Sequence, residues 1–187
     1  MNILLIVIAV IVVVILLWIV IAYNGLVRLR NEADQGESSI DIQLKRRADL
    51  IPNLVEAVKG YATHESATFE NVSNARAQAL GAKSLSEKAD ADGAMQSAVG
   101  KLFAIAEAYP ELRAVESFVQ LQTELADTED KVAASRRYYN AVVQQFNTKQ
   151  QTVPTSFIAG AFGFSPRELY RLEDDADRQP IKVDLNS

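Results

Sequence analysis

The sequence contains no cysteine and only one histidine, His64, among its 187 residues. Without cysteine, a disulfide framework, a thiolate nucleophile and a cysteine-rich zinc or iron–sulfur site are excluded. With a single histidine, His-pair metal motifs are excluded as well, and a Ser-His-Asp triad would have to use His64. Positive charge is also scarce, because 19 Lys and Arg residues face 24 Asp and Glu residues, for a net charge of −5. This balance argues against a general nucleic-acid binder, which needs a basic surface.

Residues 3–22 form a run of 20 apolar residues without charge, glycine or proline. At a rise of about 1.5 Å per residue, a helix of this length spans roughly 30 Å, the thickness of the hydrocarbon core of a bilayer. We therefore predict a membrane-spanning helix. A cleaved signal peptide is the alternative, but it needs a basic n-region and a small-residue cleavage site, which are missing. Trp18 and Tyr23 lie where an aromatic belt at the membrane surface is expected.

No lysine or arginine precedes this span, whereas several follow it. Arg28 and Arg30 come just after the span, and Lys45, Arg46 and Arg47 lie further along. The positive-inside rule thus favours a cytoplasmic location for the C-terminal part, with a periplasmic or extracellular location as the alternative. We expect Arg28 and Arg30 to lie close enough to the membrane to contact anionic headgroups.

After the span, apolar residues recur every three or four positions, which is typical of amphipathic helices. The first such stretch, residues 26–61, is expected to continue directly from the span and to bend near Pro52. The most regular stretch predicts a single helix over residues 110–147, with Pro110 as its first residue.

The region between these two helices has a weaker pattern. Thr63 is a candidate N-cap for a helix whose apolar positions continue to Ala79. The pattern is lost over residues 81–93, where we expect the helix to be interrupted or loosened. It returns at Met95 and ends at Pro110, where two helices are expected to meet at a tight corner.

The predicted fold class is all-α, with an N-terminal transmembrane helix leading into a bundle of three to four long antiparallel helices. Long helices joined by short connections pack in this antiparallel way. We divide the chain into an anchor (residues 1–23), a helical bundle (residues 24–164) and a short helix with a mobile acidic tail (residues 165–187).

The end of the predicted bundle is apolar and interrupted by glycine. If the segment from Phe157 to Phe164 were exposed, its apolar surface would promote aggregation. We therefore expect it to fold back over one end of the bundle. Ser165 and Glu168 have the spacing of a capping box, which predicts a short helix through Leu172.

No pattern in the sequence assembles a catalytic or metal site. The residue three before His64 is Tyr61, so the Glu-x-x-His motif of di-metal carboxylate bundles is absent. Dinucleotide and Walker fingerprints are absent too. We interpret His64, which precedes Glu65 at a helix start, as a structural turn histidine. We name no catalytic, cofactor-binding or metal-binding residue and predict that the protein is not an enzyme; an enzyme would have to rely on carboxylates and Tyr138 or Tyr139.

The basic run of Lys45, Arg46 and Arg47 could hold a lipid headgroup or a phosphate. At about 1.5 Å per residue, however, it lies roughly 33 Å beyond Tyr23, which is several times the Debye length of about 8 Å. We therefore expect these side chains to pair with the acidic face of the helix that contains Phe118, where exposed pairs add little stability but help to set the register.

Several segments of the chain resemble the LemA family. The most specific segment covers residues 40–55, with the sequence Ile-Asp-Ile-Gln-Leu-Lys-Arg-Arg-Ala-Asp-Leu-Ile-Pro-Asn-Leu-Val. The other matching segments are residues 23–31, 58–65, 107–112, 136–140 and 157–164. All of them occur in the family's order, so the resemblance covers about residues 3–170.

The chain departs from the family pattern at two places. Gly36-Glu37-Ser38 stands where an Ala-Trp-Ser run is usual, and Ala48 stands where a histidine often precedes the aspartate. If the missing aromatic contacts a partner in the family, this member has changed partners. The resemblance implies a single-pass bacterial membrane protein with a long-helix bundle and no established enzymatic activity. The family that the chain resembles also includes a magnetosome-associated branch.

Our first hypothesis is a non-enzymatic, membrane-anchored helical scaffold or adaptor that presents its bundle surface to unidentified protein partners. Residues 44–53 are a candidate surface for such a partner. The chain would contact the lipid bilayer through residues 3–22 and would bind no nucleic acid. The alternative is a homo-oligomeric structural protein, in which the faces of residues 118–146 associate and organise a membrane or a bacterial organelle.

Overall fold

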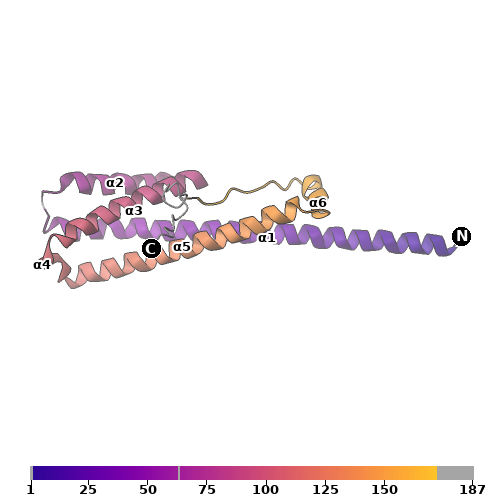
Figure 1. Ribbon diagram of the computed structural model, residues 1–187, viewed down its shortest axis with the longest axis horizontal. Helices are drawn as coiled ribbons and strands as arrows, with labels where there is room; N and C mark the ends of the chain where they lie inside the picture. Colours follow the sequence, from indigo (N-terminus) through magenta and orange to yellow (C-terminus); the bar gives the residue numbers. More distant parts are fainter. Residues whose placement is uncertain (1, 63, 172–187) are drawn as a thin grey trace, which may run out of the picture. The chain divides into compact units, whose positions relative to one another are not determined.

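The computed structural model describes residues 2–62 and 64–171. These residues form six helices and no strand (Figure 1), which confirms the all-α fold class. The helices are α1 (Asn2–Lys59), α2 (Ser66–Gly81), α3 (Leu85–Glu107), α4 (Pro110–Arg113), α5 (Glu116–Gln151) and α6 (Thr155–Ala161).

The chain is organised in two compact units. Among the described residues, the first unit comprises residues 2–40 and 133–169, and the second unit comprises residues 41–62, 64–132, 170 and 171. The first unit therefore contains the N-terminal part of α1, the C-terminal part of α5 and all of α6. The second unit contains the rest of α1 and α5 together with α2, α3 and α4.

Helix α1 joins the apolar N-terminal run to the amphipathic stretch without a break, as predicted. Its buried positions in the first unit follow the helical spacing of three and four residues. They are Ala22, Leu26, Leu29, Ala33, Gly36 and Ile40. The helix continues through Pro52, and the bend expected there stays a prediction.

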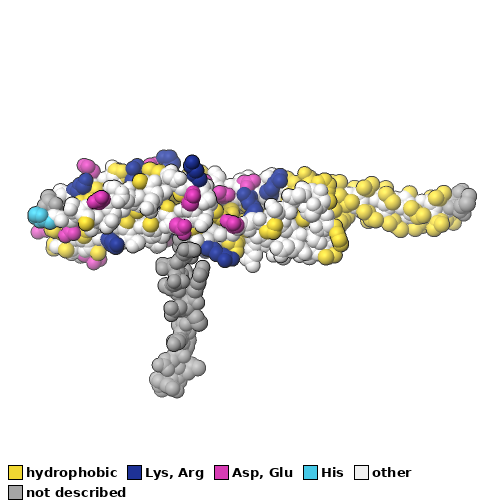
Figure 2. All heavy atoms as spheres, turned by 90° about the horizontal axis from the view of Figure 1, so that it is seen from above, with side chains coloured by type: hydrophobic (Ala, Val, Ile, Leu, Met, Phe, Trp, Pro, Cys, Tyr) yellow, Lys and Arg dark blue, Asp and Glu magenta, His cyan; other side chains and the backbone are white. Residues whose placement is uncertain are grey.

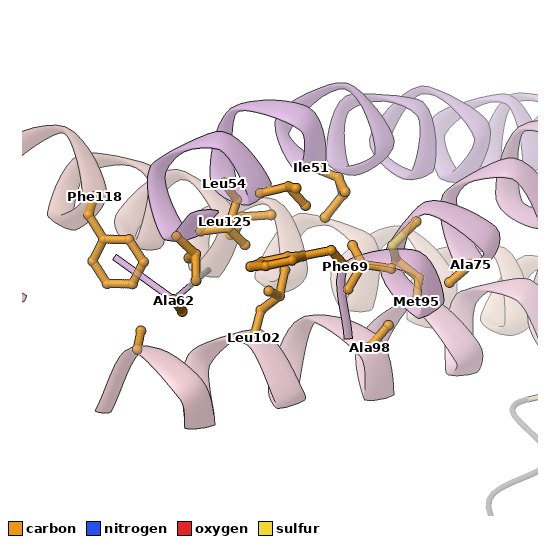
Figure 3. Packing of buried hydrophobic residues seen from close by; sticks show 14 of the residues in the cluster. Ile51, Leu54, Ala62, Phe69, Ala75, Met95, Ala98, Leu102, Phe118 and Leu125 are labelled. Atoms are coloured by element: carbon orange, nitrogen blue, oxygen red, sulfur yellow. The ribbon is translucent and has the colours of Figure 1, made fainter. Parts of the chain in front are cut away.

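The second unit has the larger hydrophobic core, to which all five of its helical segments contribute (Figure 3). Helix α2 packs along α3, and the side chains of both meet the C-terminal part of α1. Complete burial of one large apolar side chain contributes about 1.5–3 kcal/mol, so this cluster is the main source of stability in the unit. Its members with almost no exposed surface include Ile51, Leu54, Val58, Val72, Met95, Leu102 and Leu112.

The break between α2 and α3 is confirmed, but it is shorter than expected. Only residues 82–84 separate the two helices, and α3 begins at Leu85, well before Met95. The prediction of a loosened helix up to residue 93 is therefore wrong. The first turns of α3 bury Ala89, Ala91 and Asp92. Because these residues are small or charged, a search for regularly spaced large apolar residues does not detect this part of the helix.

A capping box fixes the start of α3. The Glu87 N–H donates to the Ser84 hydroxyl (3.2 Å), and the Ser84 N–H donates back to the Glu87 carboxylate (3.0 Å). The hydrogen bonds from the backbone N–H groups of Ser84 and Lys83 lower the pKa of Glu87 below its ordinary value of 4.5. Helix α2 has Glu65 at its N-cap position, and the predicted cap, Thr63, lies outside the described residues.

The prediction of one helix from Pro110 to about Asn147 is wrong in its continuity, because the helix is interrupted after Arg113, and its end lies four residues further along. Pro110 is the first residue of a helix, as predicted, but α4 ends at Arg113 and α5 runs from Glu116 to Gln151. The break is a tight turn, because the N–H groups of Ala114 and Val115 donate to carbonyls three residues back, at 3.2 and 3.0 Å. Leu112 and Phe118, on either side of the turn, are both buried.

Helix α6 ends in a Schellman motif. The Phe164 N–H donates to the Ala159 carbonyl (2.9 Å) and the Gly163 N–H to the Gly160 carbonyl (3.4 Å). Gly163 has a φ of 70°, a left-handed conformation that a residue with a Cβ adopts only with strain. The chain reverses at this glycine and packs back on the first unit.

The short helix predicted to start at Ser165 is wrong, because described residues 165–171 are not helical. Their backbone groups bond to side chains of α5 instead of to one another. Asn147 accepts from the Arg167 N–H (2.9 Å) and donates to the Arg167 carbonyl (2.8 Å), and the Tyr139 hydroxyl donates to the Glu168 carbonyl (2.9 Å). The predicted end of the helix at Leu172 and the tail beyond it lie outside the described residues.

Candidate functional site

The apolar run of α1 is largely exposed. None of its most apolar window is buried, and the first buried residue among those described is Ala22, at the end of the run. A helix of this length and composition is suited to cross a membrane. Figure 2 shows the hydrophobic side chains covering this end of α1. Trp18 and Tyr23 lie near its end, as the sequence predicts.

The surface that follows the run combines aromatic and charged contacts within the first unit. The Phe164 ring lies 5.8 Å from the Tyr23 ring and 6.2 Å from the Phe146 ring, measured between centroids. The Arg30 guanidinium stacks 5.5 Å above the centre of Phe164. Arg28 is exposed and pairs with Glu32 on the same helix. Of the two arginines expected near the headgroups, Arg30 is thus also part of the packing.

Arg167 ties the C-terminal segment to α1 through three contacts. Its guanidinium lies 2.5 Å from the Asp34 carboxylate and 3.6 Å from the Glu37 carboxylate, and it donates to the Arg30 carbonyl at 3.2 Å. Its side chain is one-quarter exposed. Bonds from a guanidinium to carboxylates are charge-assisted and stronger than neutral ones, so this residue holds the C-terminal segment in place.

Of the three basic residues 45–47, two are exposed to solvent and one is buried. Lys45 and Arg46 are exposed, and Lys45 pairs with Asp49 on its own helix at 2.8 Å. The hydrogen bond from Lys131 lowers the pKa of Asp127, and the positive charge of Arg46 acts in the same direction. Lys45 thus pairs along its own helix rather than with the acidic face of α5, and the pairing expected for Arg46 stays a prediction.

Arg47 is different, because it is buried at the centre of an ionic cluster in the second unit. Only 3% of its side chain is exposed. Its two terminal nitrogens contact the carboxylates of Asp92 on α3, at 2.5 Å, and of Glu129 on α5. The Tyr170 hydroxyl donates to the second oxygen of Asp92 at 2.9 Å and thereby attaches the C-terminal segment to the same cluster. The pairing of Arg47 with α5 is confirmed, but as an interior contact rather than a surface one.

A cleft of about 310 Å³ opens beside this cluster, between α3 and α5. Its walls are apolar where Val99, Phe103 and Leu125 contribute, and polar where Gln96 and Gln122 contribute. Arg47 and Glu129, together with the small residues Gly100 and Ala126, complete its lining. Such a volume is at the lower end of the range found for ligand pockets and fits one large side chain. No pattern in the sequence indicates this cleft.

The remaining residues considered in the sequence do not assemble into a reactive centre. His64 lies exposed in the turn before α2. Tyr138 is 47% exposed, whereas Tyr139 is buried, and burial raises the pKa of Tyr139. In residues 2–62 and 64–171, no group of three His, Cys, Asp or Glu side chains is placed to hold a metal ion.

A sequence model of the LemA family matches residues 36–185 of the chain. The chain belongs to the LemA family. Magnetosome protein MamQ 2 of Paramagnetospirillum magneticum is 26% identical over 192 residues, which cover 87% of this chain and 69% of the relative. Magnetosome protein MamQ of Magnetospirillum gryphiswaldense is 27% identical with the same coverage. Protein LemA of Metamycoplasma hominis is 28% identical over 73% of this chain and 63% of the relative.

Both departures from the LemA pattern occupy packed positions in this member of the family. A Cβ on Gly36 would lie 3.2 Å from the Cα of Tyr139, so the glycine allows α1 and α5 to approach closely in the first unit. Its neighbour Glu37 pairs with Arg167. Ala48 is buried, and its carbonyl accepts a hydrogen bond from Arg76 at 2.7 Å.

Proposed function

We propose that this LemA-family protein is a non-enzymatic, membrane-anchored helical scaffold that presents a bundle surface to protein partners. The observation that carries the proposal is the uninterrupted helix α1, which is apolar and exposed over residues 3–21 and packed from Ala22 onward. One helix thus serves as membrane anchor (residues 1–23) and as a structural element of the bundle (residues 24–164). A scaffold needs this rigid coupling, and a freely diffusing enzyme does not.

The cleft between α3 and α5 is the part of the bundle surface that we assign to partner contact. Its lining combines apolar side chains with two glutamines, a composition suited to docking an anchoring side chain of a partner. This assignment replaces residues 44–53 as the candidate surface, because Arg47 and Ile51 within them are buried. Lys45 and Arg46 stay available on the adjacent surface.

Photo-crosslinking in living cells tests the scaffold proposal. Gln122 lines the cleft, and Gln120 is also exposed but lies about 200° away around α5, so the two positions form a matched pair. With benzoylphenylalanine in place of Gln122, we expect a discrete adduct in the full-length protein. The Gln120 variant should give none. Equal yields at both positions, or no adduct at either, would contradict the assignment.

The magnetosome relatives favour a second candidate, a homo-oligomeric structural protein that organises a membrane. The same crosslinking experiment distinguishes the two functions through the mass of the adduct. A product with the mass of two copies of this chain would support the oligomer, and a product containing a different protein would support the scaffold. Co-isolation of two differently tagged copies is the independent check.

We also propose that the part of the chain after the span lies in the cytoplasm of a bacterium, because Arg28 and Arg30 follow the span and no basic residue precedes it. The absence of cysteine allows a test with no background. In spheroplasts treated with a membrane-impermeant maleimide, we expect an Asn2→Cys variant to be labelled and a Ser66→Cys variant to be protected until the cells are lysed. The reverse pattern would place the bundle on the outer side.

A further inference from the structure

The segment around α6 has the composition of a membrane-contacting element. No charged residue occurs from Gln150 to Pro166, and Lys149 and Arg167 flank this stretch. Several of its large apolar side chains face solvent: Val153 is 69% exposed, Phe157 72% and Phe162 57%. Exposed apolar groups in such number mark an interaction surface rather than an ordinary protein exterior.

Helix α6 presents two different faces. Ile158 and Ala159 are buried, whereas Phe157 is exposed. Phe162, the residue after the helix, is more than half exposed although one side of its ring contacts the first unit. The buried pair and the contact of Phe164 with Phe146 hold the segment on α5, so the exposed side chains sit on a fixed support. The exposed side chains therefore keep a fixed position on the first unit.

Two separate contacts place this segment beside the end of the apolar run. The ring of Phe162 lies 4.8 Å from the ring of Tyr23, which is the residue directly after the run. The Lys149 ammonium packs against Gly25, because it lies only 2.2 Å from the position that a Cβ atom on this glycine would occupy. Figures 1 and 2 show the same arrangement, with α6 beside α1 and hydrophobic side chains continuing from the run onto this end of the first unit.

We propose that α6 and its flanking turns insert Phe157, Phe162 and Val153 into the interfacial layer of the same membrane that α1 crosses. The proposal rests on the proposed membrane anchoring of α1. Tyr23 directly follows the last residue of the run. Side chains at the same depth as Tyr23 therefore lie at the boundary between headgroups and acyl chains. A short amphipathic element at that depth buries its apolar face among lipids, and Lys149 beside it can contact anionic headgroups. The occupant of this exposed face is therefore lipid.

The chain provides an internal reference for testing this proposal, because Trp18 is its only tryptophan. The full-length protein is reconstituted into phosphatidylcholine vesicles with or without brominated acyl chains, which quench tryptophan fluorescence on contact. Quenching of Trp18 in the native chain reports insertion of the span. In a Trp18→Phe background, Phe157→Trp reports on α6, and Tyr138→Trp, an exposed aromatic position on α5 in the same unit, is the matched control.

We expect brominated lipid to quench the Phe157→Trp variant to an extent comparable with Trp18, and to leave the Tyr138→Trp variant unchanged. Quenching of Trp18 without quenching at position 157 would overturn the inference while leaving the anchor intact. Absence of quenching at Trp18 would show instead that the anchoring proposal itself fails. Protection of the position 157 indole from both brominated lipid and aqueous iodide would assign the face to a second copy of the chain and would also overturn the inference.

Discussion

Replacing Arg47 with alanine is expected to lower the free energy of unfolding of the second unit by about 3–5 kcal/mol. The substitution removes the guanidinium that contacts the buried carboxylate of Asp92 and the partly buried carboxylate of Glu129, and breaking a buried ion pair by removing one partner has a cost of this size. Guanidinium denaturation of the full-length protein in detergent, followed by circular dichroism at 222 nm, measures the difference.

Two further variants show whether the ion pairs are the cause. Lys45→Ala removes a neighbouring charge on α1 whose pair with Asp49 is exposed, so the expected loss is only about 0.2–1 kcal/mol. Adding Asp92→Asn and Glu129→Gln to an Arg47→Met variant removes both carboxylate charges of the cluster and should restore much of the lost stability. If Arg47→Ala costs no more than Lys45→Ala, solvent reaches the cluster and the assignment as a buried centre is wrong.

Tyr139→Ala is expected to destabilise the first unit by about 3–5 kcal/mol, the range for deleting a buried aromatic side chain. Tyr139 is only 2% exposed, packs against Gly36 and donates to the Glu168 carbonyl. Tyr139→Phe keeps the ring and loses only the hydrogen bond, so about 1 kcal/mol is expected. The same denaturation measurement provides both values.

The adjacent residue, Tyr138, is the control for this pair. Because 47% of Tyr138 is exposed, its replacement by alanine should have a much smaller effect than that of Tyr139. Similar losses for both tyrosines would mean that the close approach of α1 and α5 at Gly36, rather than burial of the Tyr139 ring, governs stability there. Limited proteolysis after residue 164 would then distinguish detachment of the C-terminal segment from unfolding of the unit.

Periodicity in the sequence predicts most of the helical architecture because the long helices bury large apolar residues at regular positions. The continuous α1 and the long α5 are recovered in this way, and so is Pro110 as a first helical residue. The start of α3 is missed because its buried residues there are Ala89, Ala91 and Asp92. The capping pair Ser84 and Glu87 is the signal that could have revealed it.

The ionic cluster shows a second limit of sequence reasoning. Arg47 interrupts an otherwise regular series of apolar positions in α1, and that interruption marks a polar residue on a buried face. The sequence does not indicate which carboxylates approach it, because Asp92 and Glu129 lie on other helices and meet Arg47 only in the folded chain. The extended path of residues 165–171 depends in the same way on bonds to Tyr139 and Asn147.

The unbroken passage of α1 from its apolar run into the first unit has a mechanical consequence. An apolar run in a thinner bilayer reduces its mismatch by tilting, and a helix in a thicker bilayer stands more upright. Since no loop lies between Ala22 and the packed residues Leu26 and Leu29, the part of the first unit that packs on these residues must follow that tilt. The inclination of the first unit is thereby linked to the thickness of the membrane in which the protein resides.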